Sequence, residues 1–196
     1  MAVPESRPAI IAALVGNGLI AVTKGIAAAI TGSSAMLSEA VHSLVDCGNE
    51  VLLLYGQHRS SRPADEVHPF GYGRELYFWC FVVALLIFAL GAGISIYEGV
   101  IHIRNPEAIT KPYINFVVLG LAFVFESVSW FVAWRGFQRV RGEGSIWHVV
   151  RVSKDPTMFM VLFEDTAALI GIVIAAAGTA LAVDMMLRGS TAPRPS

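Results

Sequence analysis

Apolar residues in this chain gather into long uninterrupted blocks that short polar segments separate. A helix that crosses a bilayer needs about 20 mostly apolar residues. Five blocks qualify, at residues 8–30, 34–55, 76–103, 113–134 and 158–186. Continuous blocks favour helices, because a half-buried strand alternates apolar and polar positions. The pattern predicts an all-α membrane protein, a polytopic bundle of five transmembrane helices within residues 1–187, followed by a polar tail at 188–196.

A large soluble helical bundle is the alternative, and the composition argues against it. Of the 196 residues, 55% are hydrophobic and 15% are charged, whereas a soluble domain carries about 25% charged residues. The net charge of -1 gives no bulk basicity that would indicate a nucleic-acid partner. Cys47 and Cys80 lie inside apolar blocks and form no CxxC pair, so neither a disulfide framework nor a zinc finger is expected. The chain has no GxSxG, P-loop or HExxH motif, and we expect no enzyme.

Lys and Arg are distributed unevenly among the polar segments. If the N-terminus lies inside, the inner segments carry nine of these residues and the outer segments carry four. Cytoplasmic loops of membrane proteins are enriched in Lys and Arg. We therefore expect a cytoplasmic N-terminus and, after five spans, a C-terminus on the opposite side.

Polar side chains in the second block form one stripe. Glu39, His42, Asp46 and Asn49 are spaced by three, four and three residues, which places them on one helix face. A charge at the bilayer centre costs about 2.5–3.5 kcal/mol or more, so such residues need a partner. His42 and Asp46 are one turn apart, and an imidazole nitrogen and a carboxylate oxygen can converge on Zn²⁺. The alternative is a stripe whose polar groups are satisfied by neighbouring helices.

Carboxyl groups also interrupt the last two blocks. Glu164 and Asp165 are adjacent in an apolar helix, where a bound cation or protonation would relieve their cost. Solvation near the inner surface is the alternative for Glu164. Glu126 in the fourth block suits either a proton carrier or a hydrogen bond between helices. Lys24 in the first block is expected to pair with a carboxylate, and snorkelling toward the membrane surface is the alternative.

Two segments resemble the cation diffusion facilitator family: TGSSAMLSEAVHSLVD at 31–46 and RPADEVHPFGYGR at 62–74. The resemblance extends over roughly residues 8–184. Members of that family are mostly metal–proton antiporters with six membrane helices and a cytoplasmic C-terminal domain, and they work as dimers. The resemblance implies that the loop at 56–75 is cytoplasmic, in agreement with the distribution of Lys and Arg.

The resemblance also implies a set of metal ligands. The H/DxxxD motif of the family's second helix matches His42 and Asp46, and the last residue of the HxxxD motif of its fifth helix matches Asp165. The first residue of that second motif falls on Val161. Glu164 or a water molecule would then be the fourth ligand.

A second metal site occurs in some family members, in the loop between helices 2 and 3. Its positions fall here on Asp65, His68 and Tyr72. Tyrosine is a poor zinc ligand, so we expect Asp65 and His68 to order the loop instead.

These residues predict a transporter of divalent transition metals, zinc first, that exchanges metal for protons. Its ligands must lose protons to bind metal, and Glu164 or Glu126 would take a proton, with Glu39 and Asn49 in support. One imidazole with two or three carboxylates also suits Mn²⁺, Fe²⁺ or Co²⁺. We expect no cofactor besides the transported cation.

Two other functions stay open: a carboxylate-lined proton or cation channel, and a non-transporting membrane subunit that binds metal or a partner. The chain has five spans, whereas the family has six. We therefore expect it to transport poorly by itself, either as a truncated relative or with a partner chain that supplies the missing helix. A homodimer is the other expected assembly.

Overall fold

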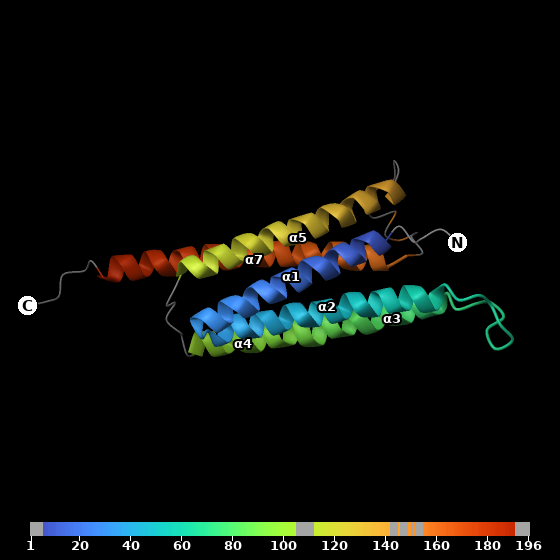
Figure 1. Ribbon diagram of the computed structural model, residues 1–196, viewed down its shortest axis with the longest axis horizontal. Coiled ribbons are helices and arrows are strands. Elements are labelled where there is room, and N and C mark those ends of the chain that lie inside the picture. Colours follow the sequence, from blue (N-terminus) through green and yellow to red (C-terminus); the bar gives the residue numbers. More distant parts are fainter. Residues whose placement is uncertain are drawn as a thin grey trace, which may run out of the picture.

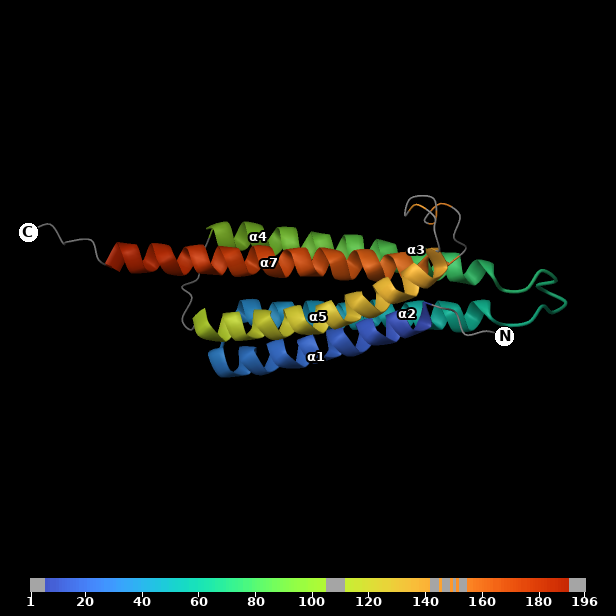
Figure 2. The ribbon, with the colours of Figure 1, turned by 90° about the horizontal axis from the view of Figure 1, so that it is seen from above.

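The computed structural model of this protein describes residues 6–104, 112–141, 145, 149, 151 and 155–190. Long helices run along one common axis, and the described residues contain no strand (Figures 1 and 2). The helices are α1 (Arg7–Thr31), α2 (Ser34–Ser60), α3 (Arg74–Leu86), η1 (Ile87–Ala92), α4 (Gly93–Arg104), α5 (Pro112–Arg141) and α7 (Thr157–Ser190). The five predicted blocks correspond to five helical rods, since α3, η1 and α4 follow one another without a break. The predicted polar tail begins inside α7, and residues 191–196 lie outside the described part.

A tight connection joins α1 to α2. Gly32 ends α1 in the left-handed region at φ 67°, a conformation that glycine adopts without steric cost. The Ser33 hydroxyl then accepts a hydrogen bond from the Met36 backbone N–H at 3.3 Å and caps α2. The two helices therefore run antiparallel and pack against each other along their length.

The third rod contains a six-residue π-helical segment, η1, which the hydropathy of the sequence does not reveal. A π segment widens the helix by one residue per turn, and such segments are frequent at functional sites. Gly91 within η1 lies opposite His42 of α2, and a methyl group at Gly91 would lie 3.6 Å from the imidazole Cε1.

Four of the described helical rods are long and apolar enough to cross a membrane, over residues 7–31, 74–101, 113–139 and 157–184. Helix α2 has 27 residues, which is long enough, but its many polar side chains make it too hydrophilic to belong to this group. All five helical rods are therefore long enough to be the predicted spans, whereas only four of them are also apolar enough. Helix α2 packs between α1 and α3, so its polar residues have protein neighbours.

Packing is closest at one end of the bundle, which we call the loop end. It holds the start of α1, the loop at 61–73 and the start of α7 (Figures 1 and 2). A cluster of buried apolar side chains joins all five rods there, including Ile10, Leu53, Val83, Phe137 and Val161, each fully buried. Burial of such side chains against one another closes the loop end.

A network of hydrogen bonds lies beside this core at the loop end. The Gln57 amide of α2 donates to the Ser6 hydroxyl at 2.6 Å and to the Thr157 hydroxyl at 3.3 Å. Ser6 and Thr157 both donate in turn to the Asp155 carboxylate. The network ties together the starts of α1 and α7 and the last turn of α2.

Candidate metal site

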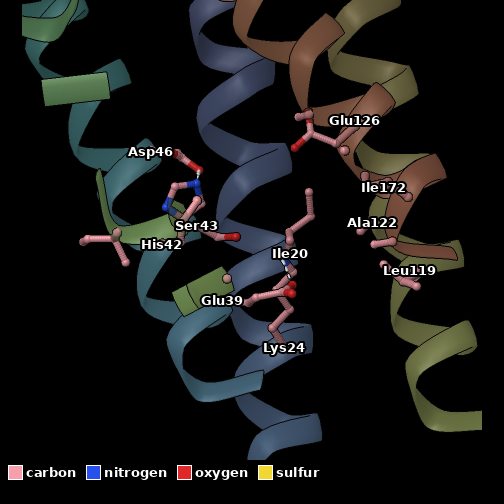
Figure 3. A pocket seen from close by; sticks show the side chains of 16 residues that line it. Ile20, Lys24, Glu39, His42, Ser43, Asp46, Leu119, Ala122, Glu126 and Ile172 are labelled. Atoms are coloured by element: carbon pink, nitrogen blue, oxygen red, sulfur yellow. Dashed lines mark ion pairs between the residues drawn. The ribbon is translucent and has the colours of Figure 1, made fainter. Parts of the chain in front are cut away.

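A cavity of about 390 Å³ occupies the half of the bundle farther from the loop end. Five helices line it: α1, α2, α4, α5 and α7. Small residues of α4 and α7, such as Gly99 and Gly171, leave this space open. Its polar lining consists of Lys24, Glu39, His42, Ser43, Asp46, Ser95 and Glu126, and Figure 3 labels all of these except Ser95.

His42 and Asp46 lie side by side on the α2 wall of the cavity (Figure 3). The His42 Nε2 atom is 3.9 Å from the Asp46 Oδ2 atom, too far for a hydrogen bond. An ion about 2.0–2.1 Å from each atom in a tetrahedral site would separate them by about 3.3 Å. Small side-chain rotations would therefore let the pair hold one ion.

Asp165 lies on the opposite side of the bundle, in the interface between α7 and α5. Its side chain is buried, and its Oδ2 atom accepts a hydrogen bond from the Ser129 hydroxyl at 2.7 Å. Ser129 thus makes a hydrogen bond between α5 and α7. Val161 belongs to the apolar core at the loop end, so the position of the family's histidine supplies no ligand.

Glu164 faces α2 from α7 and is the nearer of the two adjacent carboxylates to Asp46. Its carboxylate interacts electrostatically with Asp46 more strongly than with Asp165. Its Oε2 atom is buried and has no hydrogen-bond partner among the described residues. This burial argues against solvation of the Glu164 carboxylate at the inner surface.

Glu126 of α5 completes the lining across from the His42–Asp46 pair. Its side chain points into the cavity (Figure 3) and interacts electrostatically with both Asp165 and Asp46. Carboxylates from α2, α5 and α7 therefore approach one region of the bundle. No three His, Cys, Asp or Glu side chains within the described ranges are close enough together to hold one ion. The four residues expected to bind metal therefore do not surround one point in the described structure.

Lys24 and Glu39 form an ion pair at the end of the cavity farther from the loop end. The Lys24 Nζ atom is 3.0 Å from the Glu39 Oε2 atom, and the Glu39 side chain is 48% exposed. The expected pairing of Lys24 with a carboxylate is thus confirmed. Glu39 has a cationic partner, whereas Asp46 lies deeper.

Glu50 belongs to the same polar stripe, although the sequence analysis did not single it out. It is fully buried, and its Oε1 atom accepts a hydrogen bond from the Asn17 amide of α1 at 2.7 Å. Its position one turn after Asp46, in the series 42, 46, 50, is the signal that could have identified it. Asn49, beside it, is buried, and neither of its amide atoms has a hydrogen-bond partner within the described part of the chain.

The loop between α2 and α3 is organised around Asp65. The Asp65 carboxylate accepts hydrogen bonds from the His68 backbone N–H at 2.6 Å and from the Tyr72 hydroxyl at 2.5 Å. The Tyr72 hydrogen bond and that from His68 hold the pKa of Asp65 below its usual value. The His68 and Tyr72 rings lie 4.2 Å apart between centroids. These contacts order the loop, as expected for Asp65 and His68.

Known proteins match most of this chain. The family described as the cation efflux transmembrane domain matches residues 10–189. The human mitochondrial proton-coupled zinc antiporter SLC30A9 is 37% identical over 162 residues, which is 82% of this chain and 28% of that protein. Metal tolerance protein C4 of Arabidopsis thaliana is 36% identical over 149 residues, 75% of this chain and 33% of that protein.

More distant similarity reaches bacterial proteins. Magnetosome protein MamM of Paramagnetospirillum magneticum is 35% identical over 113 residues, 58% of this chain and 35% of that protein. The matched segment is thus about a third of the length of each of these curated relatives. Its apolar helices and the matching domain make the chain a multi-pass integral membrane protein. It belongs to the cation efflux family, also called the cation diffusion facilitators.

Proposed function

We propose that this chain carries divalent transition-metal ions, zinc first, across a membrane in exchange for protons. The observation that carries the proposal is the cavity in which His42 and Asp46 face Glu126 (Figure 3). Intramembrane ionisable groups beside a cavity are typical of ion and proton pathways. The human and plant relatives, whose names refer to zinc antiport and metal tolerance, support the same function.

His42 and Asp46 would bind the ion, and Glu164 and Asp165 of α7 would close around it. Their carboxylates interact with each other and, through Glu164, with Asp46. A neutral imidazole and ionised carboxylates are required for binding, so metal entry displaces protons. Metal and protons therefore compete for the same atoms, which is the chemical basis of antiport. Glu126 would take up a displaced proton.

The shape of the bundle supports alternating access. The apolar core and the Gln57 network close the loop end, while the cavity lies in the other half. With the loop end in the cytoplasm, as the distribution of Lys and Arg indicates, this arrangement suits release of metal away from the cytoplasm. Export from the cytoplasm is the direction we propose, with a second copy or a partner chain completing the transport unit.

Reconstitution of the 196-residue chain in liposomes with a pH gradient and a panel of divalent ions tests this function. Saturable zinc uptake that follows the pH gradient and is abolished by Asp46→Asn supports antiport. Flux that does not saturate would identify a channel instead. Zinc binding without flux would identify a metal-binding subunit.

A further inference from the structure

Three polar side chains lie beyond the cavity, on the side of the His42–Asp46 pair that faces the loop end. They are Asn49 and Glu50 of α2 and Glu164 of α7, and none of them lines the cavity. Asn49 and Glu50 are each 1% exposed. Both amide atoms of Asn49, the Oε2 atom of Glu50 and the Oε2 atom of Glu164 lack hydrogen-bond partners among the described residues.

These side chains face one another. The Glu50 carboxylate interacts electrostatically with Glu164 more strongly than with Asp46. Asn49 is close enough to the Glu164 carboxylate to interact with it. The Asn17 amide of α1 holds the Glu50 Oε1 atom at 2.7 Å and so orients the free Oε2 atom. Carboxylate oxygens from two helices therefore meet inside the bundle, where the Glu50 Oε2 and Glu164 Oε2 atoms have no hydrogen-bond partner among the described residues.

Unpaired buried polar atoms are rare in folded proteins because a group removed from water without a new partner destabilises the fold. Two carboxylates side by side add electrostatic repulsion. Lys24 pairs with Glu39, and no ion pair within the described ranges includes Glu50 or Glu164. A divalent cation would satisfy all three oxygen-bearing side chains at once, because carboxylate and amide oxygens are ligands of hard divalent ions.

We propose that Asn49, Glu50 and Glu164 form a second divalent-cation position, which we call the inner position, one turn from the His42–Asp46 pair toward the loop end. The inner position offers oxygen ligands only, so it takes oxygen-preferring ions such as Mn²⁺ and holds Zn²⁺ more weakly than a site with an imidazole. Glu164 interacts with both Asp46 and Glu50, so it is shared by the two positions. An ion that enters from the loop end would meet the inner position first. Glu164 would stay a ligand while the ion moves on to the His42–Asp46 pair. This inference rests on the proposed function.

Mn²⁺ binding to the purified full chain, measured by electron paramagnetic resonance, tests the inner position. His42→Ala removes the only nitrogen ligand of the His42–Asp46 pair and should leave Mn²⁺ binding detectable. Adding Glu50→Gln or Asn49→Leu to that variant should weaken Mn²⁺ binding by more than about tenfold. Glu66→Gln, which removes an exposed loop carboxylate, is the matched control and should leave binding unchanged.

Glu50→Gln keeps an oxygen atom for the Asn17 amide, so the variant should fold, and its metal-free melting temperature checks this. Mn²⁺ binding that survives both Glu50→Gln and Asn49→Leu in folded protein would overturn the inner position. Loss of all Mn²⁺ binding in His42→Ala alone would overturn it as well. Zinc binding and zinc flux in the chain with His42 intact report on the proposed function separately, so the two failures can be told apart.

Discussion

At the scale of single residues, Glu164 and Tyr72 are expected to differ in what they contribute to zinc binding. Glu164 has a buried carboxylate oxygen with no hydrogen-bond partner among the described residues, and its carboxylate interacts electrostatically with Asp46. The Tyr72 hydroxyl is a neutral group in an exposed loop, and it already donates to Asp65. A metal ion gains an anionic ligand from Glu164 and little from Tyr72.

Glu164→Gln should therefore weaken zinc binding by at least about tenfold, or about 1.4 kcal/mol. Tyr72→Phe should leave zinc affinity within about twofold of the unmodified chain, because it removes no ligand from the membrane site. Parallel zinc titrations of the two purified variants decide between them. A larger loss of affinity in Tyr72→Phe would show that the loop, and not α7, supplies the ligand.

The pKa of the Asp65 carboxyl group should change in Tyr72→Phe. The Tyr72 hydroxyl donates to the ionised carboxylate and lowers the pKa of Asp65 from 3.8. Because the pKa of Asp65 is depressed in the folded loop, these contacts stabilise the fold at pH values above the ordinary pKa of an aspartate. The stabilisation is lost as the pH falls through the depressed pKa. Removing the hydroxyl should raise the pKa of Asp65 toward 3.8.

Carboxyl carbon chemical shifts followed by NMR across acidic pH would report this change. Glu66→Gln serves as the control, since it alters a neighbouring loop carboxylate without removing the Tyr72 hydroxyl. An Asp65 titration curve that is the same with and without the hydroxyl would contradict the hydrogen bond.

At the scale of the elements, close approach of α2 and α3 depends on Gly56. A methyl group at Gly56 would lie 2.7 Å from the Trp79 Cβ atom, closer than real contacts allow. Trp79 is held in turn by a hydrogen bond from its indole N–H to Glu75 at 3.0 Å. Gly56→Ala should therefore destabilise the bundle by about 1–3 kcal/mol, as overpacking generally does.

Gly18→Ala is the matched control for this prediction, because nothing lies within 4 Å of a methyl group at Gly18 in α1. It should be neutral or slightly stabilising, since alanine favours helix more than glycine does. Thermal unfolding in detergent compares the two variants. Equal melting temperatures would mean that α2 and α3 are farther apart than described.

Some of the fold follows directly from the sequence, and the reasons are physical. Apolar blocks of membrane length located the helical rods, because the bilayer allows few alternatives to helix. The His42–Asp46 pair could be recognised because one-turn spacing places both side chains on one face. The π-helical segment η1 could not be predicted from the sequence. A glycine such as Gly91 is equally common where two membrane helices pack closely, so it does not indicate a π-helix. Glu50 was missed because its burial depends on Asn17 of another helix.

At the scale of the whole molecule, the structure describes a state with one closed end and one open half. The apolar core excludes water at the loop end, and the cavity reaches His42 and Asp46 from the other half. A cysteine that lines the cavity should therefore react with a membrane-impermeant thiol reagent added on the side opposite the loop.

Ala175→Cys, in a chain with Cys47→Ser and Cys80→Ser, makes this measurement possible. Ala175 lines the cavity, whereas Leu53 lies fully buried in the core and supplies the control variant Leu53→Cys. The first cysteine should be labelled rapidly and the second should not. Rapid labelling of Leu53→Cys would show that the loop end is open.

The central claim is that His42 and Asp46, with the carboxylates of α7, bind a divalent ion and release protons as they do so. Calorimetric titration of zinc into the purified 196-residue chain, in two buffers of different ionisation enthalpy, measures both quantities at once. We predict saturable zinc binding with proton release near neutral pH, both lost in Asp46→Asn and both retained in Glu66→Gln. Zinc binding that is unchanged in Asp46→Asn, or that releases no protons, would contradict the account.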